Sequence, residues 1–81
     1  MADRPKSEVQ QVLGRAVLAV RGRAGLTQQD VADGSGLHKE YVGSVERGER
    51  NMTVANLVKL CRGLGVQPSE LLKEAEREGL R

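Results

Sequence analysis

Residues 27–48 read TQQDVADGSGLHKEYVGSVERG, and the predicted architecture follows from this segment. Thr27 is of a type that caps helix N-termini, so a short helix is predicted over about residues 28–34. Gly34-Ser35-Gly36 then breaks this helix, and a second short helix is predicted over residues 38–47. Because neither helix can bury much surface alone, the two are expected to cross steeply and share one small contact.

Small and apolar side chains make the predicted contact between these two helices. Ala32 lets the backbones approach, and Gly36 can adopt the positive φ that the turn requires. Val42 and Val45, an i, i+3 pair on the second helix, close the contact. This arrangement is a helix-turn-helix unit, here about residues 27–47, whose second helix projects from the body and fits a DNA major groove about 12 Å wide.

Three further helices are predicted on either side of this unit. Ser7 begins a capping box that predicts a helix over about residues 8–24. Thr53 caps a fourth helix, and Pro68, at a first helical position, opens a fifth over about residues 68–78.

Apolar residues recur at helical spacing in the two longest predicted helices. Those predicted to face inward are Val9, Leu13, Val17 and Val20 in the first helix, and Val54, Leu57, Leu60, Cys61 and Leu64 in the fourth. No segment shows the period-2 alternation of a strand. The predicted fold class is therefore all-α, a compact five-helix bundle that forms a single domain over residues 1–81.

The composition argues against several classes of site. The chain has 81 residues and a formal net charge of +2, with one cysteine and one histidine, so disulfides, cysteine-based zinc sites and His-rich metal sites are not expected. Its longest apolar run, residues 16–20, is far shorter than the roughly 20 residues of a membrane span, and no secretion signal precedes it. We expect a soluble protein that is not an enzyme, with no catalytic residues, metal, cofactor or small-molecule ligand.

The motifs of this chain resemble a known family. Residues 27–32 (TQQDVA), 35–37 (SGL), 41–51 (YVGSVERGERN) and parts of 57–72 are similar to the lambda repressor/Cro-type (Xre-type) helix-turn-helix family. Within that family, ERGERN at residues 46–51 is similar to controller proteins of restriction–modification systems. The resemblance implies a lambda repressor-like domain that regulates transcription by binding a pseudo-palindromic DNA operator as a homodimer. It also implies a prokaryotic, cytoplasmic protein associated with the nucleoid.

The resemblance further implies which residues bind DNA, with residues 38–47 as the recognition helix in the major groove. The predicted DNA contacts are Gln28, Lys39, Glu40, Tyr41, Ser44, Arg47, Arg50 and Asn51. Lys39 suits guanine O6 and N7, whereas Glu40 either reads cytosine N4 or rejects wrong sites by repelling phosphate. The remaining contacts are predicted to reach phosphates, except that Ser44 suits either a base or a phosphate. Arg4 and Lys6, in an N-terminal arm, would add basic side chains to this DNA-binding surface.

Several of these residues also have a purely structural interpretation. Tyr41 is as well suited to cover the edge of the core as to bind phosphate. Glu46 is predicted to pair with a neighbouring arginine, because an unpaired acid there would repel DNA. Cys61 is predicted to be a buried hydrophobic residue, His38 a cap or surface residue, and residues 70–78 a solvated helix face.

The last predicted helix carries more apolar residues than docking on a small core requires. Leu71, Leu72 and Ala75 are therefore predicted to form the dimer interface. The alternative function is a protein-interaction or antitoxin-type module with the same fold, which would use an exposed apolar patch, including Leu18, away from the recognition helix.

Overall fold

The computed structural model describes residues 7–81, which fold into five helices with no strand among them. They are α1 (Glu8–Ala24), α2 (Gln28–Ser35), α3 (Lys39–Glu46), α4 (Val54–Leu64) and α5 (Pro68–Arg77). The prediction of an all-α bundle is thereby confirmed. Arg4 and Lys6, the predicted basic arm, lie outside the described residues.

The helix ends follow local capping signals, which is why the predicted boundaries agree with the structure to within two residues. The side chains of Ser7, Thr27 and Thr53 each accept a hydrogen bond from the backbone N–H three residues later, at 3.0–3.1 Å. In the second of these caps, Asp30 also accepts from the Thr27 backbone at 2.9 Å, and these hydrogen bonds lower the pKa of the Asp30 carboxyl. Gly36 ends α2 with φ of 77°, as the turn requires.

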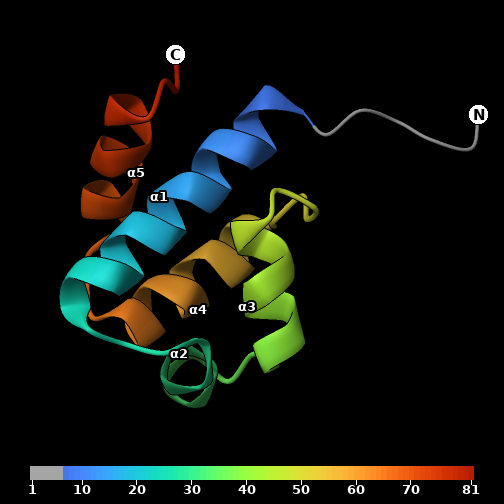
Figure 1. The fold of residues 1–81 in the computed structure, drawn as a ribbon, viewed down its shortest axis with the longest axis vertical. Coiled ribbons are helices and arrows are strands. Elements are labelled where there is room, and N and C mark those ends of the chain that lie inside the picture. The colour runs from blue at the N-terminus through green and yellow to red at the C-terminus, as the bar shows by residue number, and fades with distance from the viewer. Residues whose placement is uncertain (1–6) are drawn as a thin grey trace, which may run out of the picture.

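The helices enclose one core. Figure 1 shows α1 crossing the molecule, with α5 along one side of it and α4 beneath, and with α2 and α3 forming the opposite edge. α1 packs on α3 and α5, and α2 packs on α4. The largest fully buried side chains are Leu60, Leu71, Val17, Val31, Val42 and Cys61. Cys61 is buried as predicted, and that burial raises the pKa of its thiol.

Two residues predicted to face inward are exposed instead. Val9 and Val54 both lie in the first turn of their helices, where the partner helices do not cover them. The buried stripe of α1 runs through Val12 and Ala16 before it reaches Val17 and Val20, so the predicted stripe was displaced by part of a turn. Helical spacing shows that a stripe exists, but packing decides which of two adjacent rows is covered.

Two helix crossings depend on glycines that the sequence analysis did not single out. A Cβ on Gly14 would overlap the carbonyl oxygen of Val45, so the backbones of α1 and α3 are in contact there. A Cβ on Gly63 would lie 2.5 Å from the carbonyl oxygen of Val31, which places α4 against α2 in the same way. These contacts position the helix-turn-helix unit on the rest of the molecule.

Candidate nucleic-acid interface

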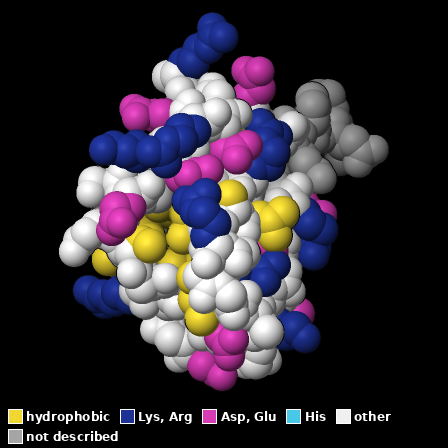
Figure 2. Space-filling view, turned by 60° about the vertical axis from the view of Figure 1, so that its left-hand side comes forward, with side chains coloured by type: hydrophobic (Ala, Val, Ile, Leu, Met, Phe, Trp, Pro, Cys, Tyr) yellow, Lys and Arg dark blue, Asp and Glu magenta, His cyan; other side chains and the backbone are white. Residues whose placement is uncertain are grey.

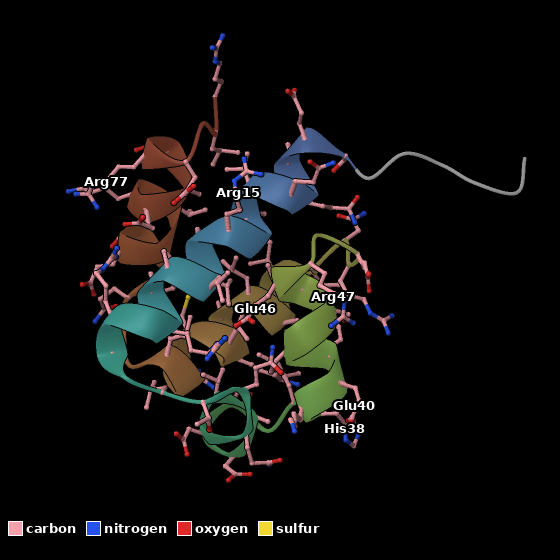
Figure 3. The ribbon with its side chains drawn as sticks, viewed as in Figure 1. Arg15, His38, Glu40, Glu46, Arg47 and Arg77 are labelled. Atoms are coloured by element: carbon pink, nitrogen blue, oxygen red, sulfur yellow. The ribbon has the colours of Figure 1, made fainter. Side chains whose placement is uncertain are left out.

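The N-terminal end of α3 lies at the surface of the helix-turn-helix unit. After Gly36, the backbone N–H of Leu37 donates to Ser35 Oγ at 3.1 Å, and the chain enters α3 at His38. His38, Lys39 and Glu40 are all exposed, and Figure 3 shows His38 and Glu40 at the free end of the helix. His38 occupies the N-cap position without a side-chain hydrogen bond to the cap, so it is a surface residue.

A buried carboxylate on α3, that of Glu46, connects this helix to α1 and α2. Glu46 on α3 accepts hydrogen bonds from Arg21 Nε at 2.5 Å and from Arg21 Nη2 at 3.2 Å, and this hydrogen bonding raises the pKa of Arg21. Gln28 Nε2, at the start of α2, donates to the same carboxylate at 2.8 Å. The side chain of Glu46 is only 5% exposed and that of Arg21 19%, so the predicted structural role of Glu46 is confirmed.

The geometry corrects the expected role of the Gln28 side chain. Its amide nitrogen is directed at Glu46, so in this arrangement it bridges α2 to α3 rather than reaching outward to a phosphate. The residue is half-buried and its side chain lies beside Gly43, where a Cβ would be 3.4 Å from Gln28 Nε2. Gln28 therefore contributes to the orientation of α3.

Ser44 is also not available to a base in this structure. It is 5% exposed, and its hydroxyl donates to the carbonyl oxygen of Tyr41 at 2.8 Å. The same hydroxyl oxygen accepts from Arg50 Nε at 3.0 Å, because the loop after α3 folds back over this part of the helix. The prediction that Ser44 contacts DNA treated it as an exposed helix position, whereas its hydroxyl holds Arg50.

Tyr41 covers the edge of the core, which is one of the two roles that the sequence left open. Its ring is half-buried and packs against the core, while the guanidinium carbon of Arg50 lies 5.4 Å from the ring centroid. Its hydroxyl oxygen accepts a hydrogen bond from Asn56 Nδ2 on α4 at 3.2 Å. Asn56 was not predicted, and no local pattern could have revealed it, since the contact joins residues 15 positions apart.

The other predicted phosphate contacts lie at the end of α3 and in the loop beyond it. Arg47 and Asn51 are exposed, and Arg47 Nε is paired with the Glu49 carboxylate at 3.2 Å. Gly48, with φ of 76°, is buried against Gln11 of α1, where a Cβ would lie 3.0 Å from Gln11 Cα. The loop therefore packs on α1. Five of the predicted DNA contacts are exposed on α3 or just after it: Lys39, Glu40, Arg47, Arg50 and Asn51.

Two of the three predicted interface residues on α5 are not at the surface. Leu71 and Ala75 are fully buried against the chain's own core, because this face of α5 docks on α1. Leu72 is 41% exposed and is the one of the three that a partner can reach.

The prediction of a solvated face over residues 70–78 is wrong at Glu74. This carboxylate is buried and accepts from Arg23 Nη2 at 2.9 Å and from Arg77 Nη1 at 3.1 Å, which together hold its pKa below the usual value. Figure 2 turns the α5 side of the molecule forward and shows basic and acidic side chains crowded around apolar ones. A shallow hollow of about 470 Å³ lies here, with Val20, Ala24 and Val66 among its lining residues.

Other classes of site find no support in the part of the chain that the structure describes. Residues 7–81 contain no group of three or more histidine, cysteine, aspartate or glutamate side chains placed to hold a metal ion. Within the same range, no helix is both long enough and apolar enough to span a membrane.

Comparison with known proteins places these features in a family context. The family described as helix-turn-helix matches residues 17–71. The chain is 38% identical over 74 residues to control protein C.SmaI of Serratia marcescens, covering 91% of this chain and 84% of that protein. Among solved structures, the restriction–modification controller protein C.AhdI from Aeromonas hydrophila is 40% identical with a TM-score of 0.73, over 76% of this chain and 94% of that one. A tetramer of the controller protein C.Esp1396I bound to its natural 35-base-pair operator is 28% identical with a TM-score of 0.84, over 89% and 95% of the two chains.

Proposed function

This chain belongs to the helix-turn-helix family, and we propose that it is a sequence-specific transcriptional regulator that binds a pseudo-palindromic operator as a homodimer. One observation carries the proposal. The opening turn of α3 stands exposed with Lys39 and Glu40, while the buried Glu46 network holds the rest of that helix to α1 and α2. A rigidly held helix with a polar free end is what major-groove reading requires.

The candidate contacts divide into two classes. Lys39 and Glu40 occupy the first turn of α3, the part of a recognition helix that meets base edges, so we assign sequence reading to them. Arg47, Arg50 and Asn51 follow at the other end, where cationic and amide groups suit phosphates. The net charge of only +2 is consistent with this division. Affinity for DNA then depends on the few basic side chains at this surface, Lys39, Arg47 and Arg50, and binding to non-specific DNA is expected to be weak.

Two copies are needed for specific affinity, since one short helix contacts only a half-site. A two-fold axis would set two α3 helices about 34 Å apart, one turn of duplex. We assign the self-association surface to the exposed face of α5 around Leu72. Two such dimers on one operator would form a tetramer, and C.Esp1396I is a tetramer in complex with its operator. The similarity to control proteins favours a role in regulating a restriction–modification system, in the cytoplasm and at the nucleoid.

The alternative function, a protein-interaction module, is supported by one observation. Leu18 on α1 is 47% exposed and lies on a different helix from the proposed DNA surface. The exposed first turn of α3 and the similarity to controller proteins both favour DNA binding over this alternative.

Selection of random duplexes by the purified protein tests the proposed function. Enrichment of two inverted half-sites, with centres about one helical turn apart, is the expected result. A pool in which no sequence is enriched over any other, at low as well as moderate salt, contradicts it and favours the interaction module.

A further inference from the structure

We propose that Asn56 is a positioning residue that orients the Tyr41 hydroxyl to donate a hydrogen bond to a DNA phosphate. The inference rests on the proposed DNA-binding function and deepens it, by adding a residue of α4 to the phosphate-binding machinery. It depends on the direction of one hydrogen bond, on the position of Arg50 and on the place of Asn56 in its helix.

The direction of the hydrogen bond between Asn56 and Tyr41 determines whether the Tyr41 hydroxyl can donate to another group. The amide nitrogen of asparagine only donates, so at 3.2 Å from Tyr41 Oη it makes the hydroxyl oxygen an acceptor. The hydroxyl hydrogen is not used in this contact and is directed elsewhere. A phosphate oxygen only accepts, so it is a suitable partner for that hydrogen, and a donor chain of this kind strengthens each bond in it.

Arg50 supplies the charge for the same phosphate. Its Nε donates to Ser44 Oγ at 3.0 Å and its guanidinium carbon lies 5.4 Å from the Tyr41 ring centroid, so the group is held close to Tyr41. A guanidinium presents its terminal N–H groups as a fork that matches phosphate oxygens. Tyr41 and Arg50 therefore form one preorganised clamp, held by Asn56 and Ser44.

The role of Asn56 can be tested by substitution because its backbone and its side chain make separate hydrogen bonds. Its backbone N–H donates to the Thr53 cap at 3.1 Å, a contact that survives any side-chain substitution. Asn56 is the third residue of α4, where an acidic side chain favours helix formation. Asn56→Asp therefore preserves the helix, yet it replaces the hydrogen-bond donor to Tyr41 Oη by an acceptor, so the hydroxyl donates to the new carboxylate instead of to DNA.

The experiment measures the affinity of the full chain for its selected operator. Asn56→Asp is compared with Ala55→Asp, which places the same charge on the neighbouring exposed residue of α4 and serves as the matched control. We expect Asn56→Asp to weaken binding by at least roughly tenfold more than Ala55→Asp, with an unchanged or higher thermal midpoint. In a Tyr41→Phe background, the two acidic variants are expected to bind equally.

A second readout locates the clamp on the DNA. Methylphosphonate is introduced at one operator phosphate at a time, which removes the charge from that position. The wild-type protein is expected to lose affinity at one phosphate per half-site where both Tyr41→Phe and Asn56→Asp show a clearly smaller loss. Equal affinities for Asn56→Asp and Ala55→Asp, or a difference that persists with Tyr41→Phe, overturn the positioning role alone. Absence of operator binding by the wild-type protein overturns this inference and the proposed function together.

Discussion

Two buried carboxylates, Glu46 on α3 and Glu74 on α5, each pair with an arginine on α1. Glu46 is 5% exposed and satisfies donors from Arg21 and Gln28 at once. Its counterpart on the other side of the molecule is Glu74, buried between Arg23 and Arg77. The donors from α1 and α2 offset the cost of burying Glu46, and removing its charge leaves Arg21, which is only 19% exposed, without a counter-charge.

Replacement of Glu46 by glutamine tests how much its buried charge contributes to the stability of the fold. We expect Glu46→Gln to lower the free energy of unfolding by about 3 kcal/mol, because Arg21 is then left without a counter-charge. Urea unfolding followed by circular dichroism measures the change. Glu49→Gln is the control, since the Arg47–Glu49 pair is exposed and a change below about 1 kcal/mol is expected. A similar small loss for both variants contradicts the assigned role of Glu46.

Glu74 makes a prediction about pH. Hydrogen bonds from Arg23, and then from Arg77, lower the pKa of Glu74 in the folded chain. Its contribution to stability is therefore complete above the unfolded-state pKa of about 4.3 and is lost as the pH falls through the lower folded value. The stability difference between wild type and Glu74→Gln should be constant from pH 7 to about 5 and shrink below about 4. Glu76→Gln, at an exposed position of the same helix, should show a smaller difference throughout.

The helix α3 has an exposed first turn, to which we assign base reading, and a far end that is anchored to other helices. Lys39 belongs to its exposed first turn, and Arg50 lies in the loop that folds back onto its far end. We expect Lys39→Ala to change the preferred base at one operator position. Arg50→Ala should weaken binding to all sequences alike and reduce the log–log salt slope by roughly 0.9 for each phosphate that the protein no longer neutralises. The two effects are distinguished by measuring the affinity of each variant for a series of operators that carry single base substitutions. If both lose affinity uniformly, the assignment of Lys39 to base reading is wrong.

The helices were predictable to the extent that their signals are local. Caps such as Thr27 and the glycine after α2 act within a few residues, so the boundaries follow from the sequence, and the family predicted from residues 27–51 is confirmed. Ser44 and Glu74 were misassigned because their environments come from Arg50 and Arg23, which lie on other segments. Helical spacing places a side chain on a face, but long-range packing decides whether that face is open.

The fold places the proposed DNA-binding surface and the proposed self-association surface on different helices. α3 lies on one edge of the bundle and α5 on the opposite side of α1 (Figure 1). The Glu46 network and the Gly14 crossing hold α3 to α1, and the Glu74 network holds α5 to the same helix. α1 thus connects α3 and α5, so the proposed two-fold contact through α5 would set the distance between two α3 helices and with it the spacing of the half-sites.

Leu72→Glu tests this connection. Leu72 is 41% exposed, and a charge there should prevent two α5 helices from associating, so the variant is expected to sediment as a monomer at micromolar concentration. Because the second half-site then no longer binds as part of one unit, operator affinity should fall by at least roughly a hundredfold. Leu18→Glu is the matched control, since that leucine is 47% exposed on α1 and should leave both properties unchanged. A dimer that survives Leu72→Glu, or dissociates with Leu18→Glu instead, would move the two-fold axis away from α5 and the predicted half-site spacing with it.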